Sequence, residues 1–147
     1  MKKNLLLTLA LIVVTTLIGC SKDDDNNSNS SPTIVGKWRT IKFEYYTNGV
    51  LDETETIVEE NSSCPDYIEF KDNGTYVVID NNATCNSTAD ESGTYVYNGT
   101  TISTTSGGST DISTVITLTN TDLKTDFTET SSGGTVFKNV GYFKKIN

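Results

Sequence analysis

The feature that most restricts the fold of this chain is a regular succession of short strand patterns and tight turns after residue 34. Apolar and β-branched residues alternate with polar ones over short segments, and none of these segments shows a helical period. Two-residue turn signals such as Asn48-Gly49 and Asn98-Gly99 separate neighbouring segments. Short antiparallel strands joined by tight turns form sandwiches or barrels, so the sequence predicts an all-β domain. The expected strands are 37–47, 50–58, 67–71, 75–80, 93–97, 100–104, 111–119, 122–128 and 135–145.

Two of these segments depart from simple alternation. The segment 50–58 is weakly apolar and rich in acidic residues, so it is either a strand of the main sheet or only an added hairpin, in which case eight strands remain. In the first segment Trp38 is out of phase with Ile41, Phe43 and Tyr45. A bulge near Arg39-Thr40 would bring these side chains to one face.

The N-terminus has the pattern of an export signal. Lys2 and Lys3 precede an apolar run from Leu5 to Ile18, which is shorter than the roughly 20 apolar residues of a membrane-spanning helix. The run ends in Leu17-Ile18-Gly19-Cys20, which resembles the lipobox of bacterial lipoproteins. This resemblance implies that residues 1–19 are a lipoprotein signal peptide and that Cys20 carries the lipid. The alternative is an ordinary secretory signal followed by a chance cysteine.

Residues 20–33 are expected to form a linker. They are built mainly from Ser, Lys, Asp and Asn, and such a composition does not bury enough apolar surface to fold. Within the linker, Lys22-Asp23-Asp24-Asp25 resembles the export signals of Bacteroidota-type lipoproteins. That resemblance implies an outer-membrane, lipid-anchored protein that faces the medium. A solvated spacer is the alternative.

The charge of the chain excludes one class of partner. Removal of residues 1–19 leaves 9 basic and 19 acidic residues, a formal charge of −10. Such a surface repels nucleic acid and anionic lipid head groups, so membrane attachment must come from the lipid on Cys20. The chain also has no histidine, which removes the usual general base and the commonest metal ligand. We therefore expect no cofactor, no metal site and no enzymatic activity.

Cys64 and Cys85 remain as an even pair in an oxidising compartment. A hairpin that turns at Asp72-Asn73 would pair Phe70 with Thr75, which places both cysteines just beyond the open end of that hairpin. A disulfide is therefore expected, with two reduced thiols as the alternative.

Gly36-Lys37-Trp38 at the first strand resembles the G-x-W signature of lipocalins, and residues 34–147 are similar to the short lipocalin-like domains of bacterial lipoproteins. The other features that carry this resemblance are Phe70 before the Asp72-Asn73-Gly74 turn, Gly93-Thr94-Tyr95, Cys64 and Cys85, and Gly141-Tyr142-Phe143-Lys144. The resemblance implies an antiparallel up-and-down β-barrel of about eight strands, whose interior holds a small apolar ligand. It also implies that Thr125-Asp126-Phe127 matches a Thr-Asp-Tyr motif, and that Lys144 or Lys145 covers Trp38.

Strand alternation selects the side chains that would line such an interior. Trp38 has two interpretations, a plug at one end of the barrel or a wall of the ligand site. Asp52, Glu53, Glu55, Glu59 and Glu60 lack the spacing of a calcium loop and fit a charged edge hairpin. The cavity candidates are Trp38, Ile41, Phe43, Ile68, Phe70, Tyr76, Tyr95, Leu118 and Phe143.

Three functions stay open at this point. The barrel binds a small hydrophobic or amphipathic ligand at the cell surface, or its interior is filled and it acts as an interaction or structural component of an envelope assembly. A third and weaker hypothesis is an enzyme that uses carboxylates alone. An apolar pocket larger than about 300 Å³ favours binding. A filled interior with an exposed apolar patch favours a protein partner, and a buried carboxyl pair favours catalysis.

Overall fold

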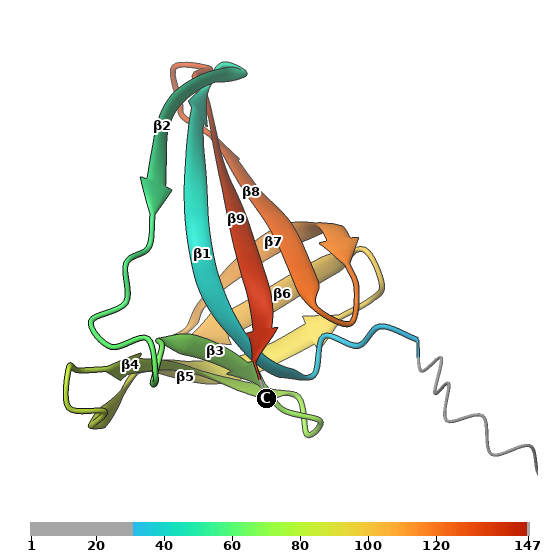
Figure 1. Ribbon diagram of the computed structural model, residues 1–147. Helices are drawn as coiled ribbons and strands as arrows, with labels where there is room; N and C mark the ends of the chain where they lie inside the picture. Colours follow the sequence, from blue (N-terminus) through green and yellow to red (C-terminus); the bar gives the residue numbers. More distant parts are fainter. Residues whose placement is uncertain (1–30, 147) are drawn as a thin grey trace, which may run out of the picture.

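The structure, a computed structural model that describes residues 31–146, is built from antiparallel β-strands (Figure 1). Cys20 and the segment Lys22-Asp23-Asp24-Asp25 lie outside these residues. No helix in the described part is long and apolar enough to cross a membrane. The strands are β1 (Gly36–Thr47), β2 (Val50–Thr56), β3 (Tyr67–Phe70), β4 (Thr75–Asn81), β5 (Ser87–Tyr97), β6 (Thr101–Ser106), β7 (Ser109–Leu118), β8 (Asp122–Thr130) and β9 (Val136–Ile146).

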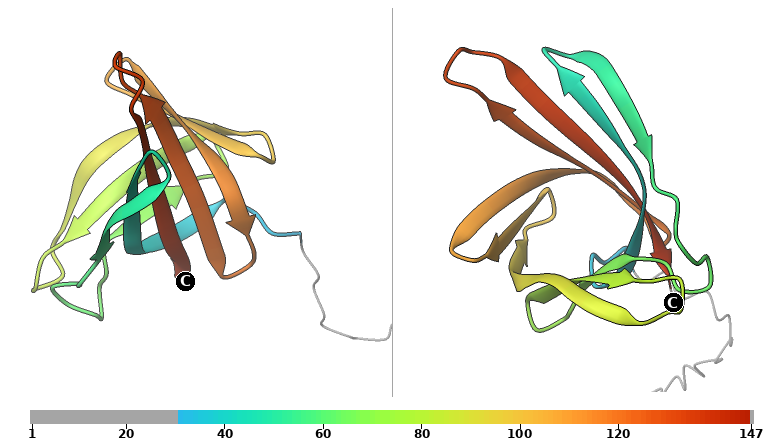
Figure 2. Two further views of the ribbon diagram at one scale, coloured as in Figure 1. Left: turned by 90° about the horizontal axis from the view of Figure 1, so that it is seen from above. Right: turned by 90° about the vertical axis from the view of Figure 1, so that its left-hand side faces the viewer.

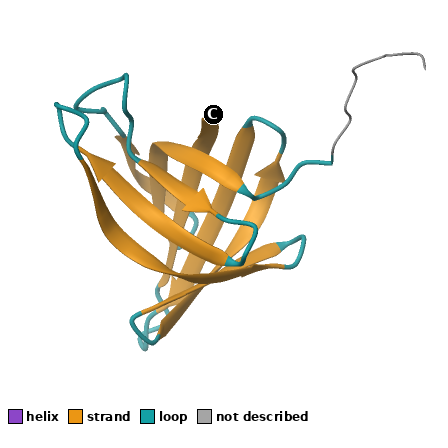
Figure 3. Cartoon of the chain, turned by 90° about the horizontal axis from the view of Figure 1, so that it is seen from below, coloured by secondary structure: helices purple, strands orange, loops and turns teal. Residues whose placement is uncertain are grey.

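Eight of the strands close into a barrel. From β3 to β9 each strand pairs with the next one along the chain, and β1 joins the two ends by pairing with both β3 and β9. Figure 3 shows the strands wrapping around a common interior with loops at both ends. The prediction of an all-β, up-and-down barrel of eight strands is therefore confirmed.

The remaining strand, β2, is an added hairpin. It pairs only with Lys42–Thr47 of β1, whereas the first residues of β1, Gly36–Trp38, pair with β3. Asn48 and Gly49 connect β1 to β2 with φ angles of 48° and 81°, as a two-residue hairpin turn of the predicted type requires. The charged and exposed β2 thus protects the edge of β1.

The two hairpins β1–β2 and β8–β9 extend beyond the rest of the barrel (Figure 2). Their tips are joined by two hydrogen bonds. The backbone N–H of Asn48 donates to the Val136 carbonyl oxygen at 2.8 Å, and the Val136 N–H donates to Asn48 Oδ1 at 3.0 Å.

A bulge in β1 accounts for the irregular phase of its side chains. The register with β9 shifts between Thr40 and Lys42, so Ile41 is the extra residue. The bulge lies one residue beyond the predicted Arg39-Thr40, and it allows Trp38 and Phe43 to pack on the same side of the strand.

Two local predictions were wrong. In the β3–β4 hairpin Phe70 pairs with Tyr76 and not with Thr75, because Thr75 is bonded to Lys71, whose backbone N–H donates to the Thr75 carbonyl oxygen at 2.9 Å. Strand β5 begins at Ser87, six residues before the expected Gly93. Its first half is polar, and backbone pairing with β4 holds it in the sheet although its side chains give no apolar alternation.

Cys64 and Cys85 form a disulfide, with Cα atoms 5.7 Å apart. The bond joins the loop before β3 to the turn between β4 and β5. The same two segments are held together by Asn61 Nδ2, which donates to the Ala83 carbonyl oxygen at 3.1 Å. The sequence-based expectation of a bridge at this end of the hairpin agrees with the structure.

Candidate functional site

Trp38 closes one end of the barrel. Its side chain has 0% exposure, and its indole Nε1 donates to the Ile34 carbonyl oxygen at 2.7 Å. Lys145 Nζ lies 5.1 Å from the centre of the Trp38 ring and donates to the Val35 carbonyl oxygen at 2.9 Å. Of the two lysines proposed to cover the tryptophan, Lys145 is therefore the one that does so.

Gly36 is needed for this arrangement. Its φ angle is +129°, and a Cβ atom on it would lie 2.7 Å from Lys145 Cε. A larger residue would push the lysine off the indole. The glycine of the Gly36-Lys37-Trp38 motif therefore makes room for the side chain that covers the tryptophan.

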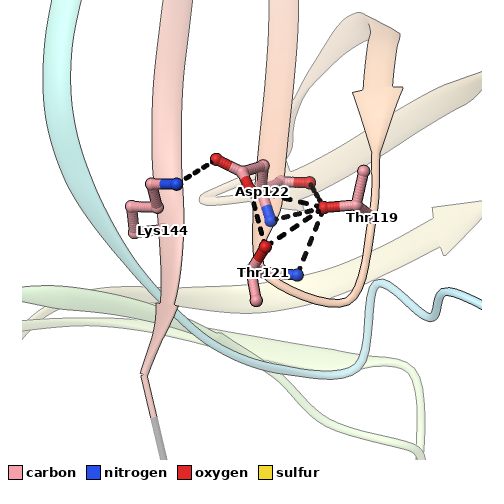
Figure 4. Close-up of polar contacts among 4 residues, drawn as sticks. All are labelled: Thr119, Thr121, Asp122 and Lys144. Atoms are coloured by element: carbon pink, nitrogen blue, oxygen red, sulfur yellow. Dashed lines mark hydrogen bonds and ion pairs between the residues drawn. The ribbon is translucent and has the colours of Figure 1, made fainter.

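Lys144, on the other side of β9, forms a separate contact (Figure 4). It pairs with Asp122, whose backbone N–H donates to Thr119 Oγ1 at 2.8 Å and whose Oδ2 accepts from Thr121 Oγ1 at 2.6 Å. The hydrogen bond from Lys144 is the main reason why the pKa of Asp122 is lowered from its usual value. This network fixes the β7–β8 turn against β9.

The same turn corrects the position of the Thr-Asp motif. Thr125-Asp126-Phe127 lies inside β8 and not between strands. The Thr-Asp pair that lies at the turn before β8 is Thr121-Asp122, and the Lys145 N–H donates to the Thr121 carbonyl oxygen at 2.9 Å. The near match at residues 125–127 is therefore not the motif at the turn between these strands.

A cavity of about 200 Å³ lies in the barrel interior above Trp38. Its inner part is apolar, and its outer part carries hydroxyl and carboxylate groups. Each of the eight barrel strands contributes at least one side chain to its wall. The lining residues are Trp38, Ile68, Phe70, Tyr76, Val78, Glu91, Ile102, Thr104, Asp111, Ser113, Leu123, Thr125 and Phe143.

The mouth of the cavity is acidic. Glu91 and Asp111 are exposed to solvent, whereas Tyr76 is buried beneath them and donates its hydroxyl hydrogen to Glu91 Oε1. Burial, together with this hydrogen bond, raises the pKa of Tyr76 to about 12. Tyr76 is therefore a neutral hydrogen-bond donor at physiological pH, placed where the apolar part of the cavity meets the polar part.

The structure brings together five of the nine candidates chosen by alternation. Trp38, Ile68, Phe70, Tyr76 and Phe143 line the cavity.

The other four do not line it. Phe43, Tyr95 and Leu118 pack against the core without reaching the cavity, and the Tyr95 and Phe70 ring centres are 4.9 Å apart. Ile41 was chosen wrongly, because the bulge removes it from the alternation; it lies in a separate surface hollow beside Lys42 and Tyr142.

Sequence reasoning missed the polar half of the lining. Glu91 lies in the polar first half of β5, and Thr104, Asp111, Ser113 and Thr125 occupy inward positions where alternation leads one to expect apolar residues. No local signal marks these residues. Ile102 and Leu123, in contrast, are each apolar between polar neighbours, so the same alternation rule could have found them.

The cavity is smaller than the roughly 300 Å³ at which typical small-molecule sites begin. The interior is thus neither empty enough for a long or bulky ligand nor completely filled. Its dimensions suit a compact molecule.

Solved structures with a similar course of the chain include bovine odorant-binding protein. Its complex with a selenium-containing odorant is 19% identical, with 76% of this chain and 72% of that chain covered and a TM-score of 0.42. Its complex with undecanal is 14% identical, with 80% and 76% covered and a TM-score of 0.43. A search of curated proteins by sequence finds no significant match.

A family model gives the assignment. The model of the lipocalin-like domain matches residues 34–125, which is more than half of the 147-residue chain. The matched part begins just before the Gly36-Lys37-Trp38 motif and covers most of the closed barrel. The chain belongs to the lipocalin-like domain family.

Proposed function

We propose that this protein binds a small hydrophobic or amphipathic molecule in the barrel cavity, while a lipid on Cys20 holds it at the outer membrane, facing the medium. The observation that carries the binding function is the cavity of about 200 Å³, walled by all eight barrel strands and ending at Trp38. Removal of apolar ligand surface from water at the inner end would supply the affinity, at about 25 cal/mol per Å².

The proposed role is binding and not catalysis. Catalysis by a carboxyl pair relies on environments that separate the two pKa values, usually through burial of one of them. Glu91 and Asp111 are both exposed, and Glu91 is already hydrogen-bonded to Tyr76. The absence of histidine from the chain supports the same interpretation.

The test of binding uses Trp38 as an internal reporter, because it is the only tryptophan of the chain and lines the cavity. Titration with short alkyl and single-ring aromatic compounds is expected to change Trp38 emission and to raise the melting temperature together. A ligand at 100 times its Kd adds about 2.7 kcal/mol of stability.

Two neighbouring residues of β7 provide a matched pair of variants. Ser113 lines the cavity, whereas Ile112 is 56% exposed. Ser113→Phe should fill the cavity and abolish both responses, and Ile112→Phe should leave them unchanged. Equal binding by the two variants would show that the ligand binds outside the cavity. If the parent protein responds to none of the compounds, the proposed binding function is wrong.

The membrane location is supported by the sequence alone, through the lipobox ending at Cys20 and the segment Lys22-Asp23-Asp24-Asp25. Cys20→Ser is expected to abolish labelling by a fatty-acid analogue. Replacement of the three aspartates by alanine should keep the label but protect the protein from protease added to intact cells. Labelling of the serine variant would contradict a lipid on Cys20. Equal digestion of the alanine variant and the parent by protease on intact cells would contradict the role of the three aspartates in export.

A second candidate function is favoured by an apolar patch at the tips of the β1–β2 and β8–β9 hairpins. Val50 and Phe137 are 66% and 42% exposed, and both pair in the sheet with Thr47, so their side chains lie on the same face. Such a patch fits a protein partner in an envelope assembly. If Ser113→Phe keeps the cellular role and Val50→Ser together with Phe137→Ser loses it, the patch and not the cavity carries the function.

A further inference from the structure

The charges that face the cavity are of one sign. Glu91 of β5 and Asp111 of β7 are the charged members of the lining, and no lysine or arginine contributes to it. Within residues 31–146 neither carboxylate takes part in a salt bridge. The mouth of the cavity therefore has two negative charges without a cationic partner.

These groups lie on three consecutive strands. Asp111 pairs with Thr104 of β6, which also lines the cavity, and β6 lies between β5 and β7 in the sheet. On the neighbouring β4 strand Tyr76 donates its hydroxyl hydrogen to Glu91. The result is a group of hydrogen-bond acceptors, two of them charged, around the entrance to an apolar chamber.

On the basis of the proposed function, we propose that the ligand is a compact cationic amphiphile, an apolar group that carries a protonated amine. The apolar group lies against Ile102, Phe70 and Trp38, and the ammonium group lies between Glu91 and Asp111. An ammonium group has three donors, and charge-assisted hydrogen bonds to carboxylates are about twice as strong as neutral ones.

The same arrangement rejects anionic ligands. A ligand carboxylate at the mouth would lie beside two negative charges, and no lysine or arginine in the lining would offset the repulsion. The sequence after residue 19, with a formal charge of −10, adds to this repulsion. The volume of about 200 Å³ further restricts the apolar part to a single ring or a short branched chain.

Three probes of nearly equal shape test this selectivity: 2-phenylethylamine, 2-phenylethanol and phenylacetate. Their Kd values are measured by Trp38 emission and by calorimetry at low and high salt. We expect the amine to bind at least about tenfold more tightly than the alcohol, and the carboxylate to bind most weakly. Added salt should weaken binding of the amine and leave that of the alcohol unchanged.

Two charge-neutralising variants locate the effect. Glu91→Gln and Asp111→Asn should each weaken amine binding several-fold and leave the Kd of the alcohol unchanged. Asp90→Asn is the matched control, because Asp90 neighbours Glu91 in β5 but does not line the cavity.

The outcomes separate this inference from the function on which it rests. If the amine and the alcohol bind equally, or if neither neutralising variant affects the amine, the cationic class is wrong and the binding function stands. If none of the three probes binds, and titration with the other alkyl and aromatic compounds does not distinguish Ser113→Phe from the parent, both the inference and the binding function are wrong.

Discussion

Replacement of Trp38 by alanine is expected to lower the free energy of unfolding by about 3–5 kcal/mol. The side chain is fully buried, and it packs in the same core cluster as Phe70 and Phe143. Its removal would join its own volume to the cavity and leave the Ile34 carbonyl oxygen without its 2.7 Å donor. Urea denaturation followed by circular dichroism measures the loss, since the variant has no tryptophan fluorescence.

Phe137→Ala is the matched control, because this aromatic residue is 42% exposed at the tip of β9 and should cost less than about 1 kcal/mol. Trp38→Phe provides a milder change if the alanine variant does not fold. It keeps much of the apolar volume but loses the indole donor, so its loss should lie between those of the parent and the alanine variant. Equal losses for Trp38→Ala and Phe137→Ala would show that Trp38 does not close the barrel.

Conversion of both Cys64 and Cys85 to serine should lower the free energy of unfolding by about 2–4 kcal/mol. The bond joins residues 21 positions apart, and its loss restores the conformational entropy of that loop in the unfolded chain. The site lies outside the cavity lining, so ligand binding should be retained. Urea denaturation of the double variant, and of the parent with and without reductant, measures the effect.

The parent under reducing conditions should unfold at the same urea concentration as the double serine variant. Titration of free thiols in the denatured but unreduced parent should show Cys64 and Cys85 to be unreactive. Two reactive thiols at these positions would contradict the disulfide. Loss of ligand binding in the double serine variant would show that the disulfide also supports the cavity.

Much of the fold could be predicted because its signals are local. Asn48-Gly49 forms the hairpin turn that its residue types favour, and strand alternation placed Phe70, Tyr76 and Phe143 in the interior. For 50–58 the sequence left open a strand of the main sheet or an added hairpin, and the pairing of β2 with β1 alone shows the added hairpin. These features depend on residues close in sequence, for which backbone preference and hydrophobic pattern suffice.

Alternation failed where neighbouring strands set the geometry. Ile41 has the residue type of a core position, yet it is the extra residue of a bulge that exists only through pairing of β1 with β9. The choice between Lys144 and Lys145 likewise depended on that pairing, in which Trp38 lies opposite Lys145. Inward and outward directions exchange with a shift of one residue, so only the register could decide both.

By itself, the sequence determined the succession of strands and most of the turn positions, because each rests on a local pattern, and the Gly36-Lys37-Trp38 motif led to the expectation of a barrel. Tertiary structure alone decided the chemistry of the site. Glu91 and Asp111 are 20 positions apart in polar segments, and the pairing of β5, β6 and β7 places both on the wall of one cavity. Polar side chains carry no hydrophobic signal of their direction, so their position in one cavity follows from the strand register and not from a local pattern.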